Sequence, residues 1–346
     1  MKLEEIDHKI NKIFDQAVKQ GIVSGVSYAV LDEGQTFTHY LGKSYQDGPE
    51  LVPGMLYDLA SLTKVVGTAS GIFYLLDQGK IQLEDQVGNF FDTGFDQVTI
   101  KELLLHNSGL APDLENVWQY ASPAAVWEAV KASKQVYQPG TDSVYSDLNF
   151  IVLGKIMETI YQRPLNEILQ EQVFQPLGMQ DTGYLPQAEK SRFVPTEVTK
   201  ERGWVWGSVH DETAYQMGGV AGHAGLFSTL DDLVRFSLFY LEKGKESSVI
   251  QSLGDYDVFE RTLAWIRWQS GKKFYWHTGF TGPGLGIDLD NKRAIIILTN
   301  AVYPKRGNTA WQEARRAAAA VFLATSIEKV DKCKHCARII IVSLQT

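Results

Sequence analysis

Segments with the pattern of β-strands occur near both ends of this chain and leave a long middle without them. Each is short, apolar or rich in β-branched and aromatic residues, and bounded by turn residues. The segments lie at 25–31, 35–41, 262–268, 274–278, 284–289 and 294–299. Asp290-Asn291 is typical of a hairpin turn between the last two. We therefore expect one sheet whose strands come from both ends of the chain.

Helical periodicity accounts for much of the rest. Apolar residues recur at helical spacing over 3–17, before the first strands, and over 308–323, after the last ones. The middle contains further helical segments, at 62–77, 100–105, 123–133, 148–160, 165–173 and 230–241. Neither an internal repeat nor a Pro-, Gly- or Ser-rich linker divides the 346 residues. The predicted fold class is α/β (α+β): an antiparallel sheet flanked by N- and C-terminal helices, with a helical insertion.

The same pattern predicts how the chain is divided. Residues 1–60 and 262–324 are expected to form a discontinuous sheet domain, and residues 61–261 a mostly helical insertion within it. Both cysteines, Cys333 and Cys336, lie beyond these regions. No disulfide framework therefore holds the body of the protein together, and its stability depends on the hydrophobic core.

Charge and hydropathy exclude two classes of partner. The chain has 33 Lys and Arg against 41 Asp and Glu, a net charge of −8, and no basic cluster, which argues against nucleic-acid binding. The longest apolar run, 317–324, is far shorter than the ~18 residues of a membrane span. The acidic start, with Glu4, Glu5 and Asp7, does not resemble a signal peptide. We expect a cytoplasmic protein, or an exported one if a leader has been removed.

The first candidate for chemistry is Ser61-Leu62-Thr63-Lys64, at the start of a predicted helix. A serine and a lysine three residues apart lie on one helix face, where the amine can accept or hold the hydroxyl proton. Backbone N–H groups at the helix start can stabilise an oxyanion. The alternative is a helix-capping serine beside a solvated lysine, and Ser-x-x-Lys alone does not decide between them.

Two further motifs follow along the chain. Tyr145-Ser146-Asp147 precedes a helix, and its phenol could share a proton with Lys64, although Ser146 and Asp147 are also good helix-capping residues. His277-Thr278-Gly279 ends a predicted strand, where the glycine permits close approach of a substrate. Each motif alone is weak evidence; their order and their placement on helices and strands are more specific.

Together, these motifs resemble the serine β-lactamase and penicillin-binding protein superfamily, most closely the class C β-lactamase-like branch with its D-Ala-D-Ala carboxypeptidase and esterase relatives. The resemblance extends over about 6–323 and implies a β-lactamase/transpeptidase-like fold. Other stretches agree with the family's pattern: Leu104-Leu105-His106-Asn107-Ser108-Gly109-Leu110, Tyr145-Ser146-Asp147-Leu148-Asn149-Phe150, Pro176-Leu177-Gly178-Met179 and Gly222-His223-Ala224-Gly225-Leu226-Phe227-Ser228-Thr229.

The resemblance implies a mechanism. Ser61 would attack a carbonyl carbon and form an acyl-enzyme, while Lys64 and Tyr145 manage the protons. The oxyanion hole would consist of the backbone N–H groups of Ser61 and Phe280. No metal or organic cofactor is implied, because the nucleophile belongs to the chain.

The resemblance also places His277 among the catalytic residues, lining the substrate cleft with Thr278, and implies that Asp147, Thr278 and Gly279 bind the substrate. Two of these depart from the pattern of efficient β-lactamases. His277 stands where those enzymes usually carry lysine, and it has less positive charge at neutral pH. Asp147 stands where many members have asparagine; a carboxylate only accepts hydrogen bonds, so it could pair with Lys64 instead. Asn149 has the wrong spacing to replace the amide.

The expected function is therefore hydrolysis of an ester or amide through an acyl-Ser61 intermediate, with at most weak β-lactamase activity. The substrate is a small molecule or a peptide, and esterase and D-Ala-D-Ala carboxypeptidase activities remain alternatives. A penicillin-binding sensor that acylates without turnover is a third. Nothing in the sequence indicates the natural substrate or an oligomeric state.

Three other features have less specific interpretations. Core packing is favoured over an acyl pocket for the tryptophans Trp204, Trp206, Trp265, Trp268 and Trp276. Loop hydrogen bonding is favoured over a metal site for the cluster His210, Asp211, Glu212 and His223, whose spacing fits no structural zinc pattern. Residues 325–346 match nothing in the family and are predicted to be a tail outside the fold.

Overall fold

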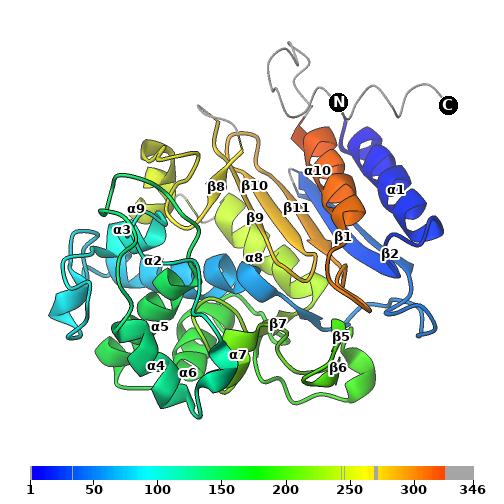
Figure 1. The fold of residues 1–346 in the computed structure, drawn as a ribbon. Helices are drawn as coiled ribbons and strands as arrows, with labels where there is room; N and C mark the ends of the chain where they lie inside the picture. Colours follow the sequence, from blue (N-terminus) through cyan, green and yellow to red (C-terminus); the bar gives the residue numbers. More distant parts are fainter. Residues whose placement is uncertain (1, 33, 243, 245, 269–271, 324–346) are drawn as a thin grey trace.

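A six-stranded antiparallel sheet forms the centre of the protein (Figure 1). The computed structural model describes residues 2–32, 34–242, 244, 246–268 and 272–323. Across the sheet the strands follow the order β2 (Gln35–Gly42), β1 (Gly25–Asp32), β11 (Arg293–Leu298), β10 (Gly284–Asp288), β9 (Phe274–Thr278) and β8 (Ile266–Arg267). Strand β1, from the start of the chain, thus pairs directly with β11, its last strand, and β2 pairs with β1 at the edge, which confirms the predicted fold class.

The two terminal helices cover one face of this sheet. Helix α1 (Leu3–Lys19) packs against α10 (Thr309–Leu323) and against β1, as Figure 1 shows. The apolar stripe of α1 is buried, and Phe14 lies against Tyr28 of β1 and Trp311 of α10 at ring distances of 5.1 and 5.6 Å. Burial of these aromatic side chains fixes the ends of the chain to each other.

The other face of the sheet packs on the helical middle of the chain. Helix α8 (Leu230–Glu242) contacts β1, β10 and β11 and belongs to the larger hydrophobic core. The remaining α-helices are α2 (Ser70–Asp77), α3 (Ile100–Leu104), α4 (Pro123–Lys131), α5 (Asp147–Tyr161), α6 (Leu165–Leu169), α7 (Glu212–Gln216) and α9 (Ser248–Ser252). Local signals set their starts: Thr99 and Glu102 form a capping box at α3.

Short elements complete the helical part. Two small sheets pair β3 (Tyr57–Asp58), β7 (Leu226–Ser228) and β4 (Gly183–Tyr184), and separately β5 (Glu197–Thr199) and β6 (Gly203–Val205). The 3₁₀ turns are η1 (Ala60–Leu62), η3 (Val87–Asn89), η4 (Val117–Gln119), η6 (Lys190–Arg192) and η7 (Leu253–Asp255). The π-helical turns are η2 (Lys64–Ala69) and η5 (Gln170–Phe174).

Three predicted elements differ from the structure: the strand over 262–268 and the helices over 62–77 and 165–173, of which the last is α6 followed by η5. The strand expected over 262–268 is limited to β8, because Ala264 has a φ of 67° and donates its backbone N–H to the carbonyl of Leu104. The single helix expected over 62–77 is instead η2 followed by α2. There the Ser70 hydroxyl donates to the Val65 carbonyl at 2.9 Å.

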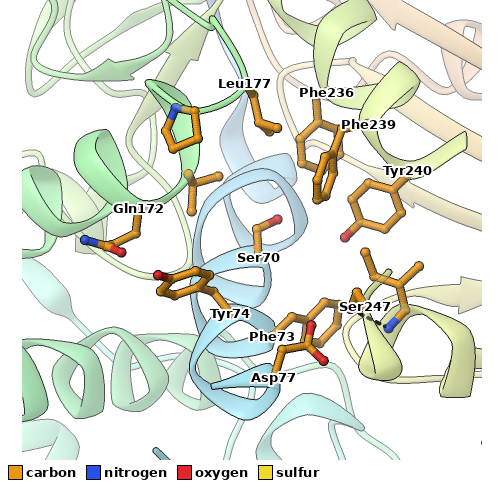
Figure 2. Close-up of a pocket in the computed structure, with 13 residues that line it drawn as sticks. Ser70, Phe73, Tyr74, Asp77, Gln172, Leu177, Phe236, Phe239, Tyr240 and Ser247 are labelled. Atoms are coloured by element: carbon orange, nitrogen blue, oxygen red, sulfur yellow. Dashed lines mark hydrogen bonds between the residues drawn. The ribbon is translucent and has the colours of Figure 1, made fainter. Parts of the chain in front are cut away.

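The remaining predictions about organisation have different outcomes. The division into residues 1–60 with 262–324 and residues 61–261 stays a prediction, and the predicted tail 325–346, with Cys333 and Cys336, lies outside the described residues. Among the described residues, no helix combines the length and apolar character needed to cross a bilayer. A cavity of about 420 Å³ lies beside α2 (Figure 2).

Candidate active site

A strained turn presents Ser61. The residue before it, Ala60, adopts a left-handed φ of 45°, which disfavours most side chains. The buried Asp58 carboxylate stabilises this turn by accepting the backbone N–H of Ala60 at 2.8 Å and that of His210 at 2.6 Å. The turn that presents Ser61 is therefore fixed by two hydrogen bonds to one buried carboxylate.

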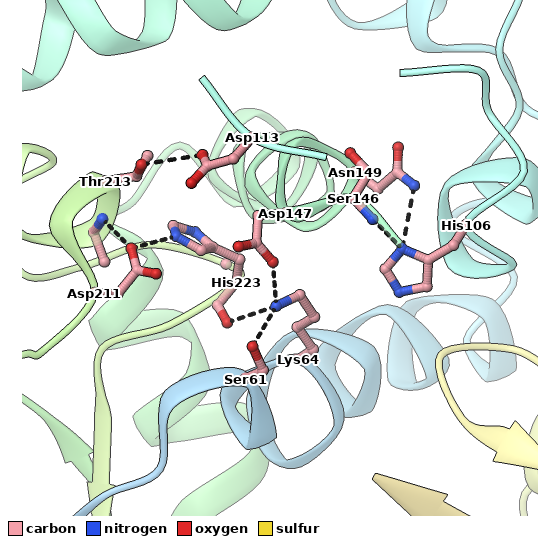
Figure 3. Close-up of polar contacts among 12 residues, drawn as sticks. Ser61, Lys64, His106, Asp113, Ser146, Asp147, Asn149, Asp211, Thr213 and His223 are labelled. Atoms are coloured by element: carbon pink, nitrogen blue, oxygen red, sulfur yellow. Dashed lines mark hydrogen bonds and ion pairs between the residues drawn. The ribbon is translucent and has the colours of Figure 1, made fainter. Parts of the chain in front are cut away.

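Lys64 connects Ser61 to a second motif of the sequence. Its Nζ donates to Ser61 Oγ at 3.0 Å and to the carbonyl oxygen of His223 at 3.2 Å, and it forms an ion pair with Asp147 Oδ1 at 2.6 Å (Figure 3). The Lys64 side chain is fully buried, so neither a solvated lysine nor a capping serine describes this pair.

The charge of Lys64 is fixed by its neighbours. Burial lowers the pKa of the ammonium, but the Asp147 carboxylate and the Tyr145 side chain outweigh burial and raise the pKa above its ordinary value. Lys64 is therefore an ammonium at neutral pH. We predicted Asp147 from the sequence as a substrate-binding residue. In the structure its carboxylate forms an ion pair with Lys64.

Tyr145 lies beside the same ammonium. Lys64 Nζ is 4.8 Å from the centre of the Tyr145 ring. Burial raises the pKa of the phenol, against the opposing charge of Lys64, so Tyr145 carries its proton at neutral pH. The His106 ring stacks on Tyr145 at 4.6 Å and fixes its plane.

The chain around Tyr145 is itself held in place. His106 Nδ1 accepts the backbone N–H of Ser146 at 3.0 Å, and Asn149 Oδ1 accepts the hydroxyl of Ser108 at 2.6 Å. Ser146 precedes α5, but its hydroxyl donates to the Ala111 carbonyl at 2.6 Å rather than capping the helix. The stretch around His106 therefore supports the tyrosine motif.

His277 at the end of β9 is uncharged. Burial, together with the positive charges of Lys64 and Arg261, lowers its pKa well below the ordinary value. Its Nδ1 donates to the Thr278 carbonyl at 3.0 Å, since a carbonyl can only accept, and this leaves Nε2 as an acceptor. His277 faces Tyr145 at a ring distance of 6.1 Å but supplies no cation for a substrate carboxylate.

Glycine at position 279 allows β9 to end close to the serine turn. A Cβ there would come within 2.5 Å of the Leu59 carbonyl oxygen and 2.7 Å of Pro283 Cγ. The next residue, Phe280, exposes its ring and stacks on His210 at 5.5 Å. The end of β9, with the predicted oxyanion donor Phe280, thus lies against the turn that carries the other predicted donor, Ser61.

Arg261 is a cation that the sequence motifs do not indicate. Its guanidinium lies 5.4 Å from the centre of the Tyr145 ring. Its Nη1 is buried without a hydrogen-bond partner among the described residues, and burial lowers its pKa. Arg261 as a whole is only partly buried, so it places a positive charge beside Tyr145 that an anionic group of a ligand can approach.

A second layer of charged side chains, Asp113, Asp211 and His223, lies to the left of Lys64 in Figure 3. His223 Nε2 pairs with Asp211 at 2.8 Å; burial lowers the pKa of His223, but Asp211 outweighs burial and raises it. Burial raises the pKa of the nearby Asp113 to about 6. Ligand atoms of Asp147, Asp211 and His223 lie within 4.8 Å of one another, but the Lys64 ammonium is paired with Asp147 and His223 Nε2 is bonded to Asp211, so these atoms are already engaged without a cation.

The rest of the predicted histidine cluster is separate from this layer. His210 Nε2 bonds Glu197 at 2.7 Å, and Arg306 pairs with the same carboxylate at 2.7 Å. Glu212, in turn, pairs with Arg306 at 2.7 Å. These contacts are loop hydrogen bonds and ion pairs that join β5 to the segment before α10.

The tryptophans do not form one pocket. Trp265 and Trp276 are buried in two different hydrophobic clusters, and Trp268 packs on Trp276 at 5.6 Å. Trp204 is exposed and packs on Trp206 at 4.7 Å. These tryptophans therefore pack in two hydrophobic cores and in one cluster at the surface.

The sequence did not reveal four contributors: His106, Arg261, Asp211 and His223. His106 lies within a stretch that matches the family pattern, and this was the available signal. The Asp211–His223 pair was visible only as a loose cluster, and a lone arginine such as Arg261 carries no signal at all.

Several known proteins resemble this chain in sequence. A family model described as Beta-lactamase matches residues 10–320. A putative D-alanyl-D-alanine carboxypeptidase of Escherichia coli (strain K12) is 28% identical over 311 residues, 71% of this chain and 69% of that protein. The one of Salmonella paratyphi B is 30% identical over 301 residues, with the same coverage.

Solved structures of other proteins share the fold of this chain. The beta-lactamase/D-alanine carboxypeptidase of Pseudomonas syringae superposes with a TM-score of 0.75 at 19% identity, covering 94% of this chain and all of that one (100%). The octameric penicillin-binding protein homologue of Pyrococcus abyssi gives a TM-score of 0.72 at 20% identity, covering 94% of this chain and 78% of that one.

Proposed function

This chain belongs to the beta-lactamase family and is a serine hydrolase, and on this basis we propose that Ser61 is its nucleophile. The observation that carries the proposal is the fully buried Lys64 Nζ, 3.0 Å from Ser61 Oγ and 2.6 Å from Asp147 Oδ1. A buried amine joined to both a hydroxyl and a carboxylate can move the hydroxyl proton. A sensor that acylates without turnover is not favoured by the comparisons.

The proton of Ser61 leaves through Lys64. Because Lys64 is an ammonium, it accepts the Ser61 proton as it passes one of its own to Asp147. The negative charge moves from Asp147 to Ser61 Oγ, which forms the bond to the substrate carbonyl carbon. The resulting oxyanion is stabilised by the backbone N–H groups of Ser61 and Phe280, each worth about 3–4 kcal/mol in comparable sites.

Tyr145 acts on the leaving group. Its phenol is protonated and donates to the leaving nitrogen or oxygen as the carbonyl is restored. The proton held on Asp147 then returns through Lys64 to Tyr145. Water hydrolyses the acyl-Ser61 ester by the reverse proton movements, which regenerates the resting state.

The substrate class we propose is a peptide with a free terminal carboxylate. The relatives from Escherichia coli and Salmonella are named D-alanyl-D-alanine carboxypeptidases. The uncharged His277 cannot bind a carboxylate by charge, but Arg261 supplies a guanidinium with an unpartnered Nη1 beside Tyr145. Arginine matches carboxylate geometry, so Arg261 is the group that favours a carboxypeptidase over a general esterase.

The test compares an N-acylated D-Ala-D-Ala peptide with the same peptide ending in an amide. We expect the wild type to prefer the acid in kcat/KM, and Arg261→Gln to lose roughly 10- to 100-fold on the acid only, the usual worth of a charged hydrogen bond. A p-nitrophenyl ester without a carboxylate should be hydrolysed equally by both proteins. Arg163→Gln, at an exposed arginine, is the control.

Two outcomes would contradict this substrate class. One is equal cleavage of acid and amide by the wild type. The other is an unchanged preference in Arg261→Gln. Either result would leave Ser61 hydrolysis of the ester standing, so the substrate class and the nucleophile are tested separately.

A further inference from the structure

Asp58 is bonded to three segments that surround the proposed nucleophile. The residue is 2% exposed and ends β3, where it pairs with Phe227 of β7. One carboxylate oxygen accepts the backbone N–H of Ala60 at 2.8 Å, and the other accepts that of His210 at 2.6 Å. Its backbone carbonyl accepts the hydroxyl of the buried Thr281 at 2.8 Å. The serine turn, the loop before α7 and the chain after β9 therefore meet at one residue.

Both proposed oxyanion donors are adjacent to these contacts. Ser61 directly follows Ala60, which is held by the carboxylate. Phe280 directly precedes Thr281, which is held by the backbone carbonyl. The Phe280 ring also stacks on His210 at 5.5 Å, and the N–H of that histidine is bonded to the same carboxylate. One buried residue therefore reaches the first donor through its side chain, and the second through both its main chain and its side chain.

The separation of the two donors matters for the reaction. An oxyanion is stabilised fully only when both N–H groups lie about 2.7–3.1 Å from the same oxygen, so a shift of either donor weakens the transition state. We propose that Asp58 is a positioning residue that holds the N–H groups of Ser61 and Phe280 at the separation an oxyanion requires. This role presupposes the acyl-Ser61 mechanism proposed above.

An amide at position 58 cannot keep both side-chain contacts. Its oxygen can accept one N–H, but its NH₂ group would face the other N–H, and two donors repel each other. Asp58→Asn therefore changes the shape little but releases either Ala60 or His210. Thr281→Val removes the hydroxyl of the main-chain contact at nearly constant volume, whereas Thr281→Ser keeps that hydroxyl. These variants test the two contacts separately.

The experiment compares a p-nitrophenyl ester with its thionoester, in which sulfur replaces the carbonyl oxygen. Sulfur accepts hydrogen bonds weakly, so the ratio of the two kcat/KM values measures how well the N–H donors stabilise the developing charge. Loss of a whole donor costs about 10²–10³-fold, so for displaced donors we expect a loss of about 10- to 100-fold on the oxygen ester. The thionoester should lose less, so the ratio should fall about tenfold in Asp58→Asn and in Thr281→Val. Thr281→Ser should keep the wild-type ratio.

Two controls make the same kinds of change elsewhere in the fold. Asp232→Asn alters a buried carboxylate that accepts the backbone N–H of Asp181 at 2.8 Å. Thr262→Val removes a buried hydroxyl that donates to the Leu253 carbonyl at 2.6 Å. Each control should keep the wild-type ratio, because a loss of folded protein lowers the rates on both esters equally. Circular dichroism checks the fold of every variant.

The ratio decides whether Asp58 has this role. An unchanged ratio in either folded variant, Asp58→Asn or Thr281→Val, would overturn the proposal, as would an equal fall in the two controls. If Asp58→Asn does not fold, Thr281→Val decides alone. Ester hydrolysis by Ser61→Ala would instead contradict the nucleophile itself, so the two failures are distinguishable.

Discussion

The ammonium of Lys64 and the carboxylate of Asp147 lie 2.6 Å apart, with the lysine fully buried. The pair keeps Lys64 protonated and gives the proton of Ser61 a destination. In the proposed route, Asp147 is therefore a proton acceptor and not a substrate-binding group. The pH dependence of the rate should therefore depend on Asp147.

Replacing the carboxylate by an amide should shift the pH–rate profile. In Asp147→Asn the amide cannot take a proton, so Lys64 must lose its own proton to solvent before it accepts that of Ser61. The acid limb of kcat/KM for a p-nitrophenyl ester should move to higher pH, with a loss of about 10²-fold at about pH 6. Asp142→Asn, in the exposed loop before α5, should keep the wild-type profile. An unmoved acid limb in Asp147→Asn would remove Asp147 from the route.

Tyr145→Phe should reduce kcat without unfolding the protein. The phenol is the proposed donor to the leaving group, and general acids contribute about 10²–10⁴-fold. Steady-state kinetics should show the largest loss with amide substrates, whose leaving groups need the proton most. Tyr28→Phe removes a hydroxyl at α1 and should leave kcat unchanged. Wild-type kcat on the peptide would exclude Tyr145 from this step.

Gly279→Ala tests whether β9 must approach the serine turn. The added Cβ would meet the Leu59 carbonyl oxygen at 2.5 Å, so the strand end has to shift away from Ser61. Displacements of about 1 Å can cost roughly 10²-fold in rate, and we expect a loss of that order in kcat. At Gly183 the nearest atom would be 3.5 Å away, so Gly183→Ala is the control. Full activity in Gly279→Ala would show that the approach is not needed.

The Asp211–His223 pair, whose histidine is fully buried and whose aspartate is 24% exposed, should contribute to stability in a defined pH window. The pKa of His223 is raised in the fold, so its contribution is complete below its ordinary pKa near 6.5 and is lost as pH rises through the raised value. Asp211→Asn should lower the free energy of unfolding by about 3–5 kcal/mol at about pH 6, as for other broken buried pairs, and by less in alkali. Urea denaturation measures this.

An exposed pair supplies the comparison. Lys19 and Asp15 lie 2.7 Å apart on the surface of α1, where ion pairs contribute about 0–1 kcal/mol. Asp15→Asn should therefore change stability little at any pH. A loss below about 1 kcal/mol in Asp211→Asn at about pH 6 would contradict a structural role for the Asp211–His223 pair.

The sequence predicted the sheet and the three motifs because their signals are local. Alternating strands, a serine and lysine one helical turn apart and a glycine at a strand end can each be recognised within a few residues. The pairing of Asp147 with Lys64 was only an alternative, because its geometry depends on how α5 packs against η2. Arg261 lies beside Tyr145 only because of the backbone before β8, where the left-handed Ala264 also prevents the strand from beginning at residue 262.

The most direct test of the account is covalent labelling of the nucleophile. A fluorophosphonate reacts with an activated serine hydroxyl and stays attached, and peptide mass mapping locates the adduct. We expect one adduct per chain on Ser61, and neither labelling nor ester hydrolysis in Ser61→Ala. Labelling of another residue, or full ester hydrolysis by folded Ser61→Ala, would contradict it.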